Sequence, residues 1–188
     1  MRIHFVTGNA GKHREASALL ARLGHACVMR TLDLPELQAD TLEEVARGKV
    51  AAARKIVDEP FFVDDAGLFV DALKGFPGVY SAHALKTIGV PGILKLLEGA
   101  PDRTARFEAV IGYWSPEAGE RYFTGISKGV IAETARDGGL GFGFDPVFVP
   151  QGQSLTFAEL PTETKNRLSH RGRALDAFAG FLAGSKPT

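Results

Sequence analysis

Residues 7–12, Thr7-Gly8-Asn9-Ala10-Gly11-Lys12, have the types and spacing suited to holding phosphate. They stand between a short apolar run and a stretch with helical spacing. A helix N-terminus attracts anions, glycines let the backbone approach them closely, and a lysine adds a full charge. The segment is not a Walker A loop, which needs four residues between its glycines and Ser or Thr after its Lys. It therefore predicts phosphate contact, and the alternative is a plain strand–helix turn with a solvated lysine.

A pair of carboxylates, Asp64 and Asp65, directly follows the apolar residues Phe61-Phe62-Val63. Ligands in open α/β sheets sit at the carboxyl ends of strands. Adjacent strand residues point to opposite faces, so one carboxylate is expected to face a site while the other holds structure. Mg²⁺ prefers hard oxygen ligands and needs only one or two carboxylates beside substrate phosphates. The pair, with Glu36 as a further ligand, predicts a magnesium site; the alternative is solvated surface acids.

Aromatic and cationic residues further along the chain are suited to a nucleobase. Residues 141–146 (GFGFDP) place Phe142 and Phe144 around a glycine in a tight turn, and aromatic rings stack on bases. The later stretch KNRLSHRGRA contains Lys165, Ser169, His170 and Arg171, of which His170 and Arg171 can donate hydrogen bonds. The alternatives are two core phenylalanines and a basic helix start on the surface.

The elements expected to position these residues alternate between strand and helix along the first third of the chain. Apolar periodicity, β-branched and aromatic content and a possible N-cap at Thr41 support this reading. The order predicts an α/β domain, 1–188, with a long central hairpin and two lobes around a cleft. The expected strands are 2–7, 26–32, 61–64, 104–114 and 121–131, and the expected helices are 12–23, 41–57 and one containing 174–182.

Composition and charge exclude several classes of protein. The 188 residues include 22 basic and 22 acidic ones, so no net charge favours binding to nucleic acid or to an anionic membrane. The first residues lack a signal-peptide pattern, and no apolar run is long enough to span a bilayer. The single cysteine, Cys27, forbids an internal disulfide. We therefore expect a cytoplasmic protein.

Taken together, the segments resemble the inosine triphosphate pyrophosphatase family, whose members hydrolyse damaged purine triphosphates such as ITP, dITP and XTP. The resemblance runs from Val6 to about Leu175. Five blocks in the same order make it specific: TGNAGK (7–12), DLPELQADT (33–41), VDDAGLFVDALKGFPGVYSA (63–82), GFGFDP (141–146) and SHRGRA (169–174). It implies an elongated, two-lobed mixed sheet with flanking helices, a Mg²⁺ cofactor and a homodimer.

The resemblance also implies roles for individual residues. The residues from Thr7 through Gly8, Asn9, Ala10 and Gly11 to Lys12 would hold the triphosphate, as would Lys49. Asp65 would bind metal and activate water, supported by Asp64, and Glu36 would share the metal. Phe142, Gly143, Phe144 and Asp145 would hold the base, and Lys165, His170 and Arg171 would complete its recognition.

The sequence departs from the family pattern at positions 66 and 144. Ala66 matches a substrate-contacting position where many members have serine, so a side-chain hydrogen bond to the ligand is expected to be absent. Phe144 stands where tyrosine or tryptophan is common, which keeps a stacking face without a polar group.

The rival readings are a related pyrophosphatase acting on modified pyrimidine or methylated nucleotides, and a catalytically silent purine-nucleotide sensor. A dehydrogenase is disfavoured because no dinucleotide glycine fingerprint follows the first strand. The SHR block favours the purine substrates, and the presence of both Glu36 and Asp65 favours an enzyme.

Overall fold

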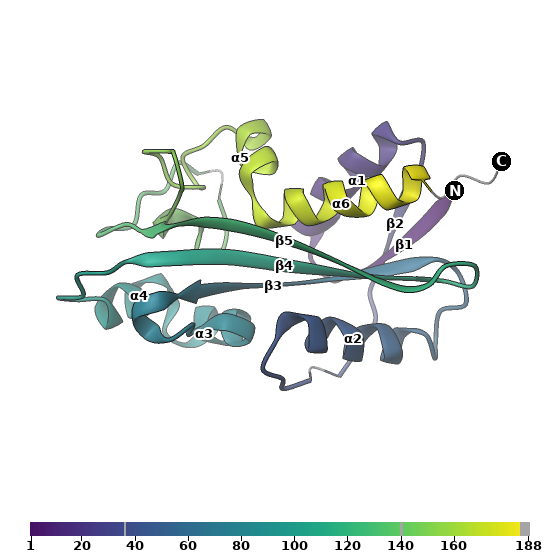
Figure 1. Ribbon diagram of the computed structural model, residues 1–188, viewed down its shortest axis with the longest axis horizontal. Coiled ribbons are helices and arrows are strands. Elements are labelled where there is room, and N and C mark those ends of the chain that lie inside the picture. The colour runs from purple at the N-terminus through teal and green to yellow at the C-terminus, as the bar shows by residue number, and fades with distance from the viewer. Residues whose placement is uncertain (36, 140, 185–188) are drawn as a thin grey trace. The chain divides into compact units, whose positions relative to one another are not determined.

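The fold is a six-stranded mixed sheet with flanking helices, seen in a computed structural model that describes residues 1–35, 37–139 and 141–184 (Figure 1). The predicted α/β class and long central hairpin are confirmed. The strand order is β2-β1-β3-β4-β5-β6. The strands are β1 (Arg2–Val6), β2 (Ala26–Arg30), β3 (Phe61–Val70), β4 (Thr104–Ser115), β5 (Gly119–Ile131) and β6 (Phe148–Pro150).

The helices fall into an early pair, a middle pair and a C-terminal pair along the chain. They are α1 (Ala10–Arg22), α2 (Leu42–Ala53), α3 (Ser81–Thr87), α4 (Gly89–Leu96), α5 (Thr162–Leu168) and α6 (His170–Gly184). Short 3₁₀ turns cover Asp71–Leu73, Gly78–Tyr80 and Asp145–Val147. None of the helices within the described ranges has the length and apolar character needed to cross a membrane.

The chain divides into two compact units that share the long strands. Unit 1 comprises Met1–Asp65, Ala109–Gly125 and the C-terminal residues from Arg173. Unit 2 comprises Ala66–Glu108 and Ile126–Gly172. The expectation of two lobes around a nucleotide cleft stays a prediction.

Alternating side chains of β3 build two different faces in unit 1. On one face Phe62 stacks on Phe5 at 4.2 Å between ring centroids and meets Phe178 of α6 at 5.3 Å. On the other face Phe61 meets Trp114 at 5.7 Å. Helices α1 and α6 cover the first face and α2 covers the second (Figure 1). Because adjacent strand residues face opposite ways, Asp64 and Asp65 are directed to different helices.

The edge of unit 1 is formed by parallel strands. Strand β1 pairs with β2 through Ile3 and Cys27, and with β3 through Phe5 and Phe62. The chain leaves β1 at Val6, so the segment 7–12 opens at the carboxyl end of a parallel strand, the position where such sheets hold ligands.

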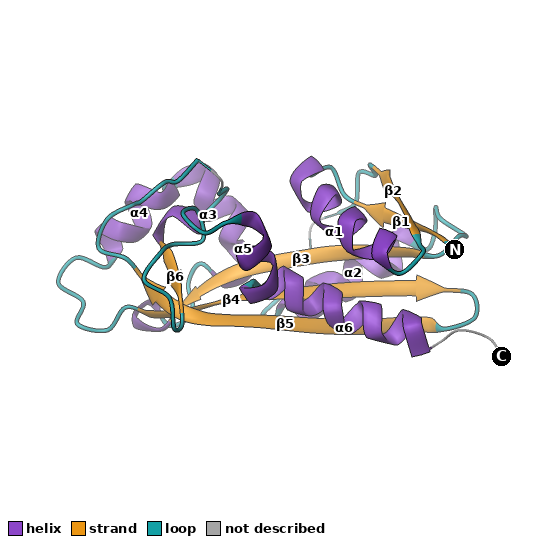
Figure 2. Ribbon diagram, turned by 90° about the horizontal axis from the view of Figure 1, so that it is seen from above, coloured by secondary structure: helices purple, strands orange, loops and turns teal. Residues whose placement is uncertain are grey.

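The core of unit 2 gathers side chains from β3, β4, α4 and the segment after β5. Phe107 contacts Phe148 at 4.7 Å and Phe157 at 6.1 Å between ring centroids. Ile93 and Leu97 of the α4 region pack into the same cluster. Strand β6 pairs antiparallel with the end of β5 (Figure 2).

Most predicted elements are confirmed, but two boundaries differ from the structure by more than two residues. The strand expected over 61–64 continues to Val70, because Leu68 and Val70 carry its apolar pattern into the core of unit 2. The helix expected over 41–57 ends at Ala53. Thr41 is its N-cap. The Thr41 hydroxyl accepts a hydrogen bond from the N–H of Glu44, and the Glu44 carboxylate accepts one from the N–H of Thr41. These bonds from Thr41 lower the pKa of Glu44.

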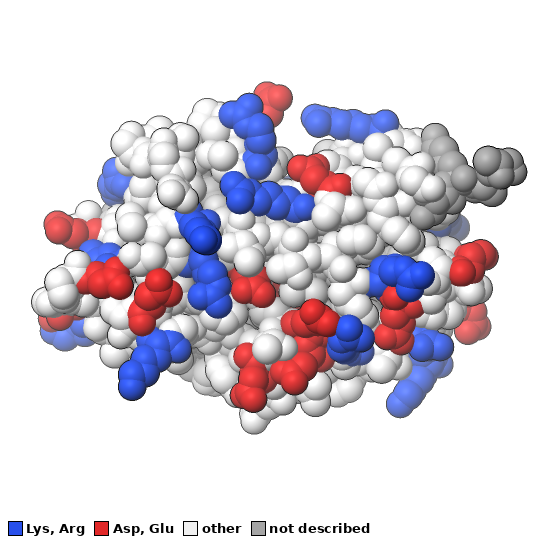
Figure 3. All heavy atoms as spheres, in the orientation of Figure 1, with Lys and Arg blue, Asp and Glu red and all other residues white. Residues whose placement is uncertain are grey.

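Charged side chains of both signs lie on the face drawn in Figure 3, and several acidic ones adjoin one another at its lower centre. This distribution agrees with the zero net charge of the sequence and gives no broad electrostatic surface for a polyanion on that face.

Candidate active site

The segment 7–12 is ordered by its own side chains. Asn9 caps α1: its side-chain Oδ1 accepts hydrogen bonds from the N–H groups of Gly11 at 2.9 Å and Lys12 at 3.1 Å. The N–H of Asn9 in turn donates to Thr7 Oγ1 at 3.1 Å. The turn is thus capped by its own side chains, and it directs Lys12 toward β3.

Lys12 contacts Asp64 through an ion pair and a hydrogen bond. Its Nζ lies 3.3 Å from Asp64 Oδ2 and 3.3 Å from the Asp64 carbonyl oxygen. The Asp64 side chain is only 1% exposed, whereas that of Lys12 is 19% exposed. A buried carboxylate is stable only when it is paired. The ion pair between Asp64 and Lys12 therefore holds the segment 7–12 against β3.

Asp65 forms the second pair, on the opposite face of β3. Its Oδ2 lies 3.0 Å from Lys49 Nζ of α2, and the two side chains are 18% and 20% exposed. Asp65 is therefore the accessible carboxylate of the two and Asp64 the buried one. Ala66 follows in β3 as the first residue of unit 2 and is partly buried.

A magnesium ion fits the donor chemistry of this site. Asp64 and Asp65 supply hard carboxylate oxygens, and Mg²⁺ is usually held by one or two carboxylates plus waters and substrate phosphates. Within residues 1–35, 37–139 and 141–184, no three His, Cys, Asp or Glu side chains gather into a metal cage. Glu36, predicted as a second ligand, lies outside the described residues. Among the described residues, Asp65 is the more exposed of the two carboxylate donors, and substrate phosphates and water would supply the other ligands.

The predicted base-recognition residues Asp145 and Lys165 form a buried ion pair in unit 2. Asp145 Oδ2 accepts from Lys165 Nζ at 2.7 Å and from the N–H of Phe142 at 2.9 Å. Their side chains are 6% and 9% exposed. The same ammonium lies 4.6 Å from the centroid of the Phe142 ring. Asp145 therefore holds both the aromatic loop and the lysine that faces it.

The two phenylalanines of this loop have different environments. Phe142 is 42% exposed, whereas Phe144 is 4% exposed and belongs to the hydrophobic cluster of unit 2. Phe144 thus packs in the core, whereas Phe142 keeps an accessible face, and the expectation that both rings hold a base stays a prediction. Gly143, between them, has φ of 65°, a left-handed conformation that glycine adopts without strain.

The SHR block is a buried junction between α5 and α6, not a basic helix start on the surface. His170 stacks on Phe107 at 4.6 Å between centroids, and the guanidinium of Arg171 lies 5.7 Å from the centroid of Phe142. Both residues are buried. The N–H of Gly172 donates to Ser169 Oγ, which caps the first turn of α6. Lys165, Arg171 and Phe142 are thereby brought together in one unit.

Sequence reasoning missed two residues that shape these segments. Phe107, in the middle of β4, supports the ring of His170 and looked like an ordinary strand residue. Gly67 lies two residues after Asp65, and a Cβ there would clash with the carbonyl oxygen of Gly78. The glycine in the motif DDAG was a visible signal, but only the fold shows which backbone approaches it.

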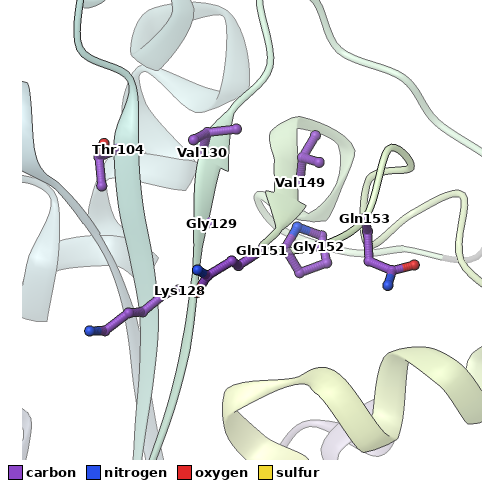
Figure 4. Close-up of a pocket in the computed structure, with 9 residues that line it drawn as sticks. Thr104, Lys128, Gly129, Val130, Val149, Gln151, Gly152 and Gln153 are labelled. Carbon is purple, nitrogen blue, oxygen red and sulfur yellow. The ribbon is translucent and has the colours of Figure 1, made fainter.

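A separate apolar pocket in unit 2 shares no residue with the predicted site (Figure 4). Its walls come from β4, β5, β6 and the turn that follows. The lining residues are Thr104, Lys128, Gly129, Val130, Val149, Pro150, Gln151, Gly152 and Gln153. Its single titratable side chain is Lys128, so this pocket lacks the carboxylates that the candidate chemistry needs.

Comparison with known proteins identifies the family. The sequence profile of the Ham1 family matches residues 3–181. The dITP/XTP pyrophosphatase of Thermococcus kodakarensis is 55% identical over 182 residues, which cover 97% of each chain. The dITP/XTP pyrophosphatase of Methanopyrus kandleri is 49% identical over 179 residues, 95% of each chain. A solved HAM1 protein from Coxiella burnetii superimposes with a TM-score of 0.88 at 31% identity, covering 98% of this chain and 100% of that one. These matches confirm the resemblance inferred from the motifs: the chain belongs to the Ham1 family.

Proposed function

We propose that this protein hydrolyses ITP, dITP and XTP to the nucleoside monophosphate and pyrophosphate. The observation that carries the proposal is the pair of adjacent carboxylates on β3, each with its own lysine and with unequal exposure. Asp64 is buried and holds the segment 7–12, whereas Asp65 is accessible to substrate and water. Relatives at 55% and 49% identity bear the name dITP/XTP pyrophosphatase, which supports the same reaction.

In the proposed reaction, a water oxygen attacks the α-phosphorus in line with the leaving group. The bond from water oxygen to phosphorus forms while the bond from phosphorus to the α,β-bridging oxygen breaks. Asp65 accepts the proton of the attacking water, and the bridging oxygen leaves with pyrophosphate. Lys12 and Lys49 offset the charge of the phosphates, because phosphoryl transfer depends mainly on positioning and charge neutralisation. Bound Mg²⁺, held by Asp65 and Glu36, would supply further charge neutralisation and a lower pKa for bound water.

Selection of the base is assigned to unit 2. Phe142 offers a stacking face, and the buried cations Lys165 and Arg171 lie against it. Hypoxanthine and xanthine have a keto oxygen at position 6, which accepts hydrogen bonds from such donors and from His170. Adenine has an amino group there and leaves the donors unsatisfied, at a cost of about 1–3 kcal/mol per contact. A homodimer stays a prediction from the family resemblance.

A substrate panel tests the proposal directly. ITP, XTP, dITP, GTP, ATP and dTTP are each incubated with the protein and Mg²⁺, and pyrophosphate is measured separately from phosphate. Pyrophosphate is expected mainly from ITP, dITP and XTP. Equal turnover of ATP and ITP would contradict the selection by the 6-keto group.

The panel also decides between the rival readings. Phosphate instead of pyrophosphate would mean that a different bond is cut. Preference for modified pyrimidines would support the related pyrophosphatase, and tight ITP binding without any turnover would support a nucleotide sensor.

Removing the exposed aromatic ring should weaken substrate binding. Because stacking on a base is worth about 1–3 kcal/mol, Phe142→Ala is expected to raise KM for ITP roughly fivefold to a hundredfold. The control is Leu155→Ala, another half-exposed apolar residue of unit 2, which should leave KM unchanged. Steady-state kinetics with ITP measures both variants. An unchanged KM for Phe142→Ala would remove this ring from base binding.

A further inference from the structure

Gly112 of β4 occupies a position in unit 1 where any side chain would clash with its neighbours. A Cβ at this position would lie 2.7 Å from Val50 Cγ2, 3.1 Å from Tyr122 Cε1 and 3.2 Å from Val63 Cγ2. These neighbours belong to α2, β5 and β3. Because glycine has no side chain, α2 can lie close to the sheet at this point.

The neighbours of Gly112 have little freedom to move aside. Val50 is fully buried, and a β-branched side chain in a helix has one strongly preferred rotamer. The Tyr122 hydroxyl donates to Glu120 at 2.9 Å, and the Arg47 guanidinium covers the Tyr122 ring at 4.2 Å. Burial raises the pKa of Tyr122, and its bond to Glu120 raises it further, so the phenol stays protonated and keeps this bond. A methyl group at position 112 would therefore press on Val50 and push against α2.

The same contacts lie beside both members of the Lys49–Asp65 pair. Val50 is the residue after Lys49 in α2, and Val63 precedes Asp65 by two positions on the same face of β3. The Lys49 Nζ to Asp65 Oδ2 distance is 3.0 Å. We infer that Gly112 is a positioning residue, which keeps α2 close enough to β3 for Lys49 to meet Asp65 and the phosphates. This inference rests on the proposed function for the role of Lys49 in turnover.

The first test is the substitution Gly112→Ala, measured by ITP turnover with Mg²⁺ and by thermal melting. A displacement approaching 1 Å at a reacting group costs up to about 100-fold in rate, so we expect kcat to fall about tenfold or more with little change in KM. The control is Gly180→Ala in α6 of the same unit, where a Cβ would have no neighbour within 4 Å. That variant should match the wild type.

Two double variants separate positioning from loss of stability. In a Lys49→Ala background, Gly112→Ala should cause no further fall in kcat, because the lysine it displaces is already gone. Val50→Ala removes the clashing methyl, so Val50→Ala/Gly112→Ala should regain the kcat of Val50→Ala alone. An equal fall in kcat with and without Lys49, or a lower melting temperature with unchanged kcat, would overturn the inference. If Gly112→Ala does not fold, Val50→Ile is used in its place, because the larger side chain crowds the space beside Gly112 from the side of α2. Its kcat is then compared with and without Lys49→Ala.

A crystal structure of Gly112→Ala decides the positional claim without any activity. A longer Lys49–Asp65 distance supports the inference, and an unchanged distance overturns it. Absence of pyrophosphate release by the wild type would instead refute the proposed function and leave this structural result standing.

Discussion

Asp65→Asn is expected to lower the rate of pyrophosphate release from ITP by about 10²–10⁴-fold, the usual contribution of a positioned acid–base group. The amide keeps the size of the side chain but cannot accept the proton of the attacking water. It is also a weaker ligand for Mg²⁺. Since Lys12 and Lys49 remain to bind the phosphates, binding of a non-hydrolysable α,β-methylene analogue of ITP should change far less than kcat. Single-turnover kinetics and calorimetric titration measure the two effects separately.

Asp71→Asn is the matched control for this prediction. Asp71 follows the same strand β3 but is exposed in a 3₁₀ turn. Its substitution should leave kcat and KM at wild-type values. Near-normal turnover by Asp65→Asn would remove Asp65 from the mechanism, and a comparable loss in Asp71→Asn would point to an indirect effect of charge.

The assignment of distinct roles to Asp64 and Asp65 could be predicted because it depends on local geometry alone. The period of two in a strand separates adjacent carboxylates, and the structure directs them to Lys12 of α1 and Lys49 of α2. The helix cap at Thr41 was predictable for a similar reason, since a capping box lies within four consecutive residues. Features fixed over a few residues are therefore visible in the sequence.

Features that depend on distant segments were not visible in the same way. The GFGFDP motif does not show that Phe144 is buried while Phe142 is exposed, because that difference arises from packing against β4 and β6. The pairing of Asp145 with Lys165, twenty positions later, likewise depends on how α5 packs. The gap beside Gly112 requires three elements to converge. Long-range packing decides each of these.

The ion pair of Asp145 and Lys165 leads to the largest expected effect on stability. The two side chains are nearly inaccessible and 2.7 Å apart. Asp145→Asn would leave the ammonium buried without its counter-charge, and breaking a buried pair in this way costs about 3–5 kcal/mol. For a chain of this length, the melting temperature should fall by roughly 6–20 °C. The control is Glu98→Gln, which breaks the exposed Lys95–Glu98 pair of the same unit and should hardly alter the melting temperature.

The double variant Asp145→Asn/Lys165→Met distinguishes a structural role from base recognition. Methionine has a length similar to that of lysine without the charge, and replacing a whole buried pair by neutral groups is often tolerated. The amide oxygen at position 145 can still accept from the N–H of Phe142. We therefore expect the melting temperature to recover toward the wild-type value. The KM for ITP should stay above the wild-type value, because the Lys165 ammonium beside Phe142 is absent. Recovery of both would show that Lys165 only balances Asp145, and a wild-type melting temperature for Asp145→Asn alone would show that the pair does not stabilise unit 2.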